Sequence, residues 1–292
     1  MNITRRRRGD RSDGRLIRSM PAFNKLMPYL MPTSNDATNL YEEPFEVSTA
    51  NSFINKLRSE GCKGIGLLHF IIAAYIRVIS MLPGVNRFVA GRRIYAANDV
   101  TVVMAVKRGM SIDASETMIK VHFQPTDTIF DVYRKMSEAV DEVRTSEEGN
   151  DTDKVADAFG KLPRGIIRFL IMIVRILDYF GILPESLLEA SPFHGSVLIT
   201  DLGSVRIRPV FHHIYNFGTL PVFIAFGAKR QTYEINKEGK VEAKKYIDMK
   251  FSLDDRIVDG HDYAQFLQGM KYIFQHPEIL EAQPSKVVED IY

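Results

Sequence analysis

Two hydrophobic periods alternate along this chain of 292 residues, and together they leave few fold classes open. Runs of alternating apolar residues such as VTVVMAV (100–106) and TMIKVHF (117–123) predict strands. A segment with apolar residues at 129, 132, 133, 136, 140 and 143 follows, and this spacing predicts a helix capped by Thr126 or Asp127. Further strands are predicted at 196–200 and 221–228, with a hairpin turn near 236–240. Helices mixed with hairpin-connected strands favour an α+β fold over a doubly wound parallel sheet.

The first 46 residues are predicted to be an irregular N-terminal arm, because prolines recur at positions 21, 28, 32 and 44. Residues 47–292 are expected to form one domain. The arm is basic at 1–18, where seven arginines accompany two aspartates, whereas the rest of the chain has a small acidic excess. Because the chain outside residues 1–18 is slightly acidic, no nucleic-acid partner is expected for it. For the arginine-rich arm, an anionic partner is the alternative to a solvated extension.

The sequence also argues against disulfide-bonded, zinc-binding, secreted and membrane-spanning proteins. The single cysteine, Cys62, excludes an intramolecular disulfide and a multi-cysteine zinc site, and no metal site is expected. No secretory signal is recognisable, so the predicted location is cytoplasmic. The apolar segment 166–182 is interrupted by Arg168, Arg175 and Asp178, which argues against a membrane span. It predicts a helix buried on most sides, either in the core, at a subunit contact or along a hydrophobic substrate channel.

The densest polar stretch is 254–261, DDRIVDGH, which lies between a predicted strand and the last predicted helix. Arg256 is the local partner for its carboxylates, and Asp259 is expected at the helix N-cap. His212 and His213 are adjacent, so a regular strand would point them to opposite faces and they could not share one metal ion. The sequence contains no standard phosphate loop, HExxH motif or GxSxG motif.

Two motifs in this half of the chain carry a family resemblance. FSLDDRIVDGHDYAQFL (251–267) resembles the Asp-His-Arg-x-x-Asp-Gly signature of the catalytic domain of dihydrolipoamide acyltransferases, the core of 2-oxo-acid dehydrogenase complexes. VLITDLGSVRIRPVFHHIYNFGTLPVFIAFGA (197–228) is similar to a second stretch of that family. The resemblance covers about 47–280 and implies the fold of chloramphenicol acetyltransferase, a mixed β-sheet with helices packed on it. It further implies a homotrimer that transfers an acyl group between a coenzyme A-type thioester and an acceptor. Coenzyme A or acyl-CoA would be a substrate, with no cofactor bound tightly.

The resemblance also assigns roles to individual residues. Asp255 stands where the family has its catalytic histidine, and Thr200 matches the serine or threonine that stabilises the oxyanion. The next position, an asparagine in the family, is Asp201 here. The residues that keep the pattern are Asp254, Arg256, Asp259 and Gly260, as structural residues of the site, and Gly203 and Asn216, as substrate-binding residues.

Three interpretations of the missing histidine follow. Asp255 acts as the base itself, although the reference pKa of a carboxyl, about 3.9, is further from that of a thiol, about 8.5, than that of an imidazole, about 6.5. Alternatively, His212, His213 or His261 supplies the imidazole and Asp255 orients it. In the third interpretation catalysis has lapsed, and the protein is a non-catalytic trimeric scaffold or binding module. The first two make the chain an acyltransferase-like enzyme, which is the preferred prediction.

Overall fold

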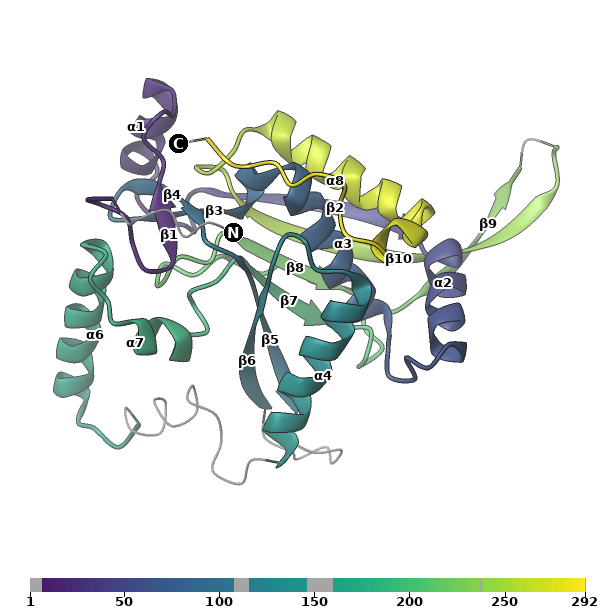
Figure 1. Ribbon diagram of the computed structural model, residues 1–292, viewed down its shortest axis with the longest axis horizontal. Coiled ribbons are helices and arrows are strands. Elements are labelled where there is room, and N and C mark those ends of the chain that lie inside the picture. Colours follow the sequence, from purple (N-terminus) through teal and green to yellow (C-terminus); the bar gives the residue numbers. More distant parts are fainter. Residues whose placement is uncertain (1–6, 108–115, 146–159, 237, 292) are drawn as a thin grey trace.

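A computed structural model describes residues 7–107, 116–145, 160–236 and 238–291. Within these residues seven strands form the main sheet, in the order β2–β10–β8–β7–β5–β6, with β9 paired to β10 (Figure 1). Their bounds are Thr38–Glu46 (β2), Val100–Lys107 (β5), Glu116–Phe123 (β6), Val197–Asp201 (β7), Val222–Phe226 (β8), Arg230–Ile235 (β9) and Val241–Asp254 (β10).

Strand direction determines which residues meet at each end of this sheet. β7 runs parallel to both β5 and β8, whereas the pairs β5–β6, β8–β10, β10–β2 and β9–β10 are antiparallel. The end of β10 therefore lies beside the start of β8, with Leu253 opposite Val222. A second, smaller sheet joins β1 (Gly14–Leu16), β4 (Arg93–Ala97) and β3 (Arg87–Ala90).

Four helices cover one face of the main sheet: α2 (Ser48–Ser59), α3 (Leu67–Met81), α4 (Ile129–Thr145) and α8 (Gly260–Gln275). Short 3₁₀ turns follow α3 and α8, at Pro83–Asn86 (η1) and Pro277–Leu280 (η2). The helices α1 (Ala22–Leu30), α6 (Arg164–Tyr179) and α7 (Glu185–Ala190) lie outside this layer, toward the left of Figure 1. The mixed sheet with its helical layer confirms the α+β expectation.

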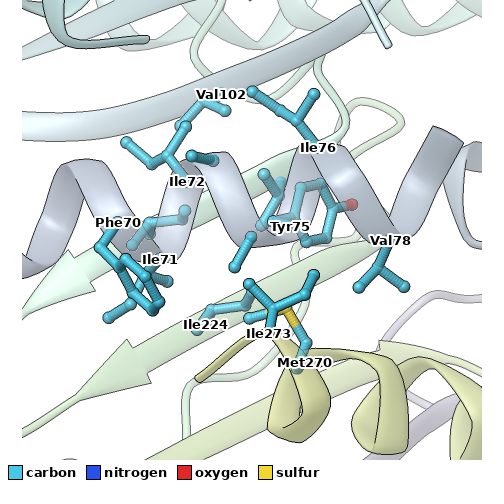
Figure 2. Close-up of a cluster of buried hydrophobic side chains, with 14 of the residues drawn as sticks. Phe70, Ile71, Ile72, Tyr75, Ile76, Val78, Val102, Ile224, Met270 and Ile273 are labelled. Carbon is cyan, nitrogen blue, oxygen red and sulfur yellow. The ribbon is translucent and has the colours of Figure 1, made fainter. Parts of the chain in front are cut away.

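The core lies between this helical layer and the sheet. Alternate residues of each strand point into it, as the period of two requires, and α3 contributes a nearly continuous run of buried residues from Phe70 to Ser80. Figure 2 shows α3 side chains packed between Val102 of β5, Ile224 of β8, and Met270 and Ile273 of α8.

The Tyr75 hydroxyl is among the buried polar atoms that lack a hydrogen-bond partner within the described residues. The side chain is fully buried, and burial raises the pKa of Tyr75. An unsatisfied buried hydroxyl costs free energy, so Tyr75→Phe is expected to increase the free energy of unfolding by about 1 kcal/mol. Urea titration checks this, with Tyr263→Phe as the control. Tyr263 donates its hydroxyl proton to the Asp254 carbonyl oxygen, so its variant should be destabilised. Loss of stability in Tyr75→Phe would contradict the expectation.

Two sequence predictions are wrong. The N-terminal arm is not irregular in its described residues, 7–46, because β1, α1 and β2 lie within them and β2 pairs with β10 along its whole length. The rest of the predicted arm, 1–6, lies outside the described residues. Pro44 is tolerated because β2 is an edge strand of the sheet. The 166–182 segment forms α6 as a helix, but no residue of α6 is buried, so it is not a core helix of this chain.

Several local predictions are confirmed. A helix is present at 129–145, although Thr128, whose hydroxyl accepts from the Asp131 N–H, caps it in place of Thr126 or Asp127. The last helix begins at Gly260, and the β9–β10 hairpin turns between Asn236 and Lys240, where the Asn236 N–H donates to the Lys240 carbonyl oxygen.

Candidate functional site

The loop after β10 is fixed by a buried ion pair. Arg256 Nη2 lies 2.6 Å from Asp254 Oδ2 and Nε lies 2.8 Å from Asp254 Oδ1, with the two side chains only 4% and 3% exposed. The same guanidinium donates to the Ser34 hydroxyl at 2.9 Å and to the Met31 carbonyl oxygen at 3.3 Å. Arg256 therefore joins the loop to the segment between α1 and β2.

Asp259 ends this loop as the N-cap of α8, as predicted. Its Oδ1 accepts from the backbone N–H groups of His261 at 2.9 Å and Asp262 at 3.0 Å. A Cβ added at Gly260 would meet no atom within 4 Å, so packing within this chain does not require glycine there. The loop thus has the strand–loop–helix construction that the family motif implies.

Asp255 is partly exposed in this loop and is held from β2. Its Oδ1 accepts from Asn39 Nδ2 at 2.6 Å, and its backbone N–H donates to the Ala37 carbonyl oxygen at 2.8 Å. Sequence reasoning missed Asn39, because it lies 216 residues away within the segment predicted to be an irregular arm. No sequence signal pointed to this contact.

The three candidate histidines make other contacts. The His212 ring stacks on Phe223 with centroids 4.2 Å apart, and burial, followed by repulsion from His213, lowers its pKa. The centroids of the His213 and Tyr215 rings lie 5.3 Å apart in an edge-to-face arrangement. His261 Nε2 lies 2.8 Å from the Gln265 side-chain amide. Within the part of the chain that the structure describes, no histidine ring hydrogen-bonds Asp255, so a base–orienter pair with Asp255 is not formed in one chain.

The segment 202–221, between β7 and β8, crosses the sheet face opposite the helical layer. The Ser252 hydroxyl of β10 donates to the His212 carbonyl oxygen, and Lys250 Nζ lies 4.3 Å from the centre of the Phe211 ring. Further along, Asn216 Oδ1 accepts from the Asn35 backbone N–H at 2.9 Å. Asn216 therefore contacts the same 31–39 segment that holds Asp255.

Thr200 and Asp255 are not neighbours in one chain. Thr200 of β7 is in register with Ala225, and Ala225 with Lys250 of β10, five residues before Asp255. At about 3.3 Å per residue and about 4.8 Å per strand, the two Cα atoms are roughly 20 Å apart.

The residues after Thr200 have local roles. Burial raises the pKa of Asp201, opposed by hydrogen bonds from the Ser204 and Gly203 backbones. A Cβ at Gly203 would lie 2.8 Å from the Gly227 carbonyl oxygen, which accounts for glycine there by close packing.

A basic cavity of about 430 Å³ opens between α2 and the start of β10. Arg58, Lys229 and Lys245 line it, together with the polar side chains of Ser48, Asn51, Ser52 and Asn55. Burial, followed by repulsion from Arg58 and Lys245, lowers the pKa of Lys229. Converging cations beside neutral hydrogen-bonding groups favour an anionic ligand such as a phosphate. Sequence reasoning missed this cavity, because its cations come from three separate segments.

A second cavity, of about 170 Å³, surrounds His122 on β6. His122 Nδ1 lies 2.7 Å from Asp99 and Nε2 lies 2.9 Å from Glu189. The hydrogen bond to Asp99 raises the pKa of His122 against the effect of burial. Burial lowers the pKa of neighbouring Lys120 to about 8, although nearby carboxylates oppose it. The described residues contain no His, Cys, Asp and Glu cluster of the kind that holds a metal ion.

Among the helices of the described ranges, none combines the length and the hydropathy that a transmembrane helix needs.

Comparison with known proteins confirms the resemblance seen in the sequence. Residues 187–282, which include β7, the 254–260 loop and α8, match the model of the family "2-oxoacid dehydrogenases acyltransferase (catalytic domain)". A search of curated protein sequences gave no match.

Solved structures show the same fold. A probable dihydrolipoamide acetyltransferase from Listeria monocytogenes is 14% identical, with a TM-score of 0.57 and coverage of 89% of this chain and 94% of that chain. The Azotobacter vinelandii dihydrolipoamide acetyltransferase is 13% identical, with a TM-score of 0.56 and coverage of 90% and 93%. A chloramphenicol acetyltransferase is 10% identical, with a TM-score of 0.54 and coverage of 89% and 99%. The expected chloramphenicol acetyltransferase-like fold is therefore confirmed.

Proposed function

We propose that this chain, whose residues 187–282 match an acyltransferase catalytic domain, transfers an acyl group from a coenzyme A-type thioester to an acceptor. The observation that carries the proposal is that the loop presenting Asp255 lies within the residues that match the family model. The buried Asp254–Arg256 pair and the Asp259 cap fix this loop, and Asn39 orients the Asp255 carboxylate. Such preorganisation is what a catalytic carboxylate requires.

The basic cavity supports a coenzyme A-type donor. Phosphate groups of such a thioester are recognised by arginine and lysine through charge-assisted hydrogen bonds, and Arg58, Lys229 and Lys245 converge there. The cavity is built on the early part of β10, whereas Asp255 follows its last residue. At about 3.3 Å per residue the two are roughly 33 Å apart, too far for one chain to use both on one thioester.

We therefore place the site between copies of the chain, in the homotrimer that the resemblance implies. One copy contributes Thr200, a neighbour contributes Asp255, and the basic cavity that holds the donor's phosphate groups belongs to a different copy from that Asp255. In the reaction, the acceptor's proton passes to the Asp255 carboxylate while the acceptor atom bonds to the thioester carbonyl carbon. Thr200 donates a hydrogen bond to the developing oxyanion. The C–S bond then breaks, and the thiolate that leaves takes up the proton. The proposal needs no metal and no tightly bound cofactor, and the cytoplasmic location stays a prediction.

A non-catalytic scaffold is the competing proposal, and one observation favours it. Within the described residues, the Asp255 carboxylate accepts a hydrogen bond from the Asn39 side-chain amide and makes none with a histidine ring. A carboxylate without an imidazole partner is a weak base toward a thiol.

The Asp255 variants distinguish the two proposals. Acceptor-dependent release of free coenzyme A is measured with acetyl- and longer acyl-CoA and a panel of thiols, amines and alcohols. The Asp255→Ala variant is expected to lose about 10²- to 10⁴-fold in rate, because it removes the general base. Asp141→Ala, on the exposed side of α4, is the control for the loss of a carboxylate. If the wild type has no measurable activity but Asp255→His is active, the site is intact and has lost its base. If neither protein is active, the scaffold is favoured.

The donor assignment has its own test in two adjacent lysines. Lys245 lines the basic cavity, whereas Lys244 points to the other face of the strand and pairs with Glu234. Lys245→Met is expected to raise the Kd for coenzyme A by at least about tenfold, because a charge-assisted contact is lost. Calorimetric titration of both variants measures this. An equal change for Lys244→Met and Lys245→Met would contradict the assignment.

A further inference from the structure

Helix α6 presents an apolar face to solvent. Ile166, Phe169, Met172, Ile176 and Tyr179 recur at intervals of three or four, so they share one side of the helix. Each is about half exposed, from 46% for Ile166 to 56% for Phe169. The two apolar residues just beyond the helix, Phe180 and Ile182, are more exposed still, at 69% and 64%. Contiguous exposed apolar residues of this kind mark an interaction surface.

Helix α1 adds a second apolar surface at the same end of the molecule (Figure 1). Four of its residues are more than half exposed: Phe23, Leu26, Tyr29 and Leu30. The turn between β3 and β4 touches both helices. A Cβ at Gly91 would lie 2.1 Å from the Tyr179 carbonyl oxygen of α6, and Arg92 Nη1 donates to the Pro28 carbonyl oxygen of α1 at 2.8 Å. This turn therefore fixes the ends of α1 and α6 relative to each other.

Basic residues border the apolar face of α6. Arg164, Arg168 and Arg175 follow one edge of it, and Lys161 precedes the helix. The one acidic residue of α6, Asp178, is already neutralised. Its Oδ1 lies 2.7 Å from Nη2 of Arg11, whose side chain is 2% exposed.

That ion pair also attaches the arginine-rich arm to this end of the molecule. Arg11 Nη1 donates to the Asp178 carbonyl oxygen at 2.7 Å, and its Nε lies 2.8 Å from Asp13. The run of four arginines at 5–8 ends three residues before this anchor in the sequence. In the described part of the arm, residues 7–18, five arginines accompany two aspartates, so apolar side chains and a surplus of arginine occur together at this end.

We propose that α6, with α1 and the arginine-rich arm, binds the surface of an anionic lipid bilayer. An interfacial helix of this type lies in the plane of the membrane, with its apolar face among the acyl chains and its cations at the headgroups. The arm adds electrostatic attraction to anionic lipids, which is the second signal that stable peripheral binding requires. This interaction neither spans the bilayer nor depends on the proposed acyl transfer.

A second copy of the chain fits this surface less well. A symmetric contact between two such faces would set the arginines of one copy against those of the other, which is unfavourable. Anionic headgroups complement the same arginines. Charge therefore favours the lipid over a two-fold contact of this kind, and a head-to-tail contact in the proposed trimer is left to the mass measurement described below.

The first experiment measures binding of the full chain to sedimenting vesicles. The vesicles are phosphatidylcholine alone or a mixture of phosphatidylcholine and phosphatidylserine, an anionic lipid of the kind that attracts clusters of arginine and lysine. Binding is expected only with phosphatidylserine and is expected to weaken as salt is added. Replacing Phe169, Met172 and Ile176 by serine should reduce the partition coefficient by at least about tenfold. The control replaces Tyr233, Ile235 and Val241 of the β9–β10 hairpin by serine. These side chains lie at the opposite end of the molecule (Figure 1) and are even more exposed than the three on α6.

The second experiment uses the absence of tryptophan from the sequence. Phe169→Trp places the chain's single tryptophan on α6. Its emission, excited selectively over that of the tyrosines, should shift to the blue with anionic vesicles and be quenched by brominated acyl chains. Tyr233→Trp on the hairpin should show neither change.

Three results would overturn the proposal: no binding to the anionic vesicles, equal loss of binding in the hairpin variant, or no change in Phe169→Trp emission. The surface would instead be assigned to a contact between copies by two results together. The wild type would not bind vesicles, and the serine variant of α6 would have a lower oligomer mass in sedimentation equilibrium.

Discussion

Replacing Arg256 by methionine is expected to lower the free energy of unfolding by about 3 to 5 kcal/mol. The substitution keeps much of the side-chain volume but leaves the Asp254 carboxylate buried without its partner, and uncompensated buried charge carries that cost. It also removes the hydrogen bonds to Ser34 and Met31 that tie the loop to the segment before β2. Thermal and urea unfolding measure the effect. In a chain of this size, it corresponds to a fall in Tm of roughly 10 °C.

Arg230→Met is the matched control for this variant. Arg230 also makes a two-pronged contact with an aspartate, Asp248, but its side chain is 38% exposed. Such a pair contributes less than about 1 kcal/mol. In the double variant Arg256→Met with Asp254→Leu the buried charge is gone, so part of the lost stability should return. Equal losses in Arg256→Met and Arg230→Met would contradict the role assigned to burial.

Replacing Gly218 by alanine is expected to destabilise the protein by more than about 3 kcal/mol. Backbone strain and a steric clash both contribute, and the same substitution at Gly239 measures the backbone strain alone. Gly218 has a φ of +82°, which strains any residue with a Cβ, and the added Cβ would lie 2.1 Å from the Phe193 carbonyl oxygen. Gly239 has nearly the same φ, +79°, but a Cβ there would meet nothing within 4 Å. Gly239→Ala therefore reports the backbone strain alone, about 1 to 2 kcal/mol.

The difference between the two alanine variants measures the close approach of Gly218 to Phe193. The Phe193 carbonyl oxygen also accepts from the N–H groups of Thr219 and Leu220, so displacing it loosens the end of the 202–221 segment. Hydrogen exchange in Gly218→Ala should consequently be faster around Asn216 than in the wild type. Equal destabilisation at 218 and 239 would show that the Phe193 contact is unimportant.

Local patterns were sufficient to predict the helix at 129–145, the N-cap at Asp259 and the β9–β10 turn. Each of these is determined by residues within a few positions of one another. β2 was missed because its pairing is with β10, up to 216 residues away, and because prolines in the segment suggested irregular structure. The Asn39–Asp255 contact was missed for the same reason. It exists only once β2 has been placed beside β10.

Helix α6 shows a different limit of sequence reasoning. Its apolar spacing correctly predicts a helix, but the spacing does not specify what covers the apolar side. We expected burial within the chain, and the structure instead leaves Phe169 and Ile176 in contact with solvent.

The pairing of β2 with β10 has a consequence for how the chain is made. Ribosomes add about 5 to 20 residues per second, so β2 emerges on the order of 10 to 40 s before its partner strand has been synthesised. During that time β2 offers an open edge, and Tyr41 and Phe45 lack the α8 aromatic rings that they contact in the finished protein. Pairing across such a sequence separation is slow even afterwards, because the intervening loop must close first. Nascent chains should therefore depend on chaperones until the last quarter of the sequence has been translated.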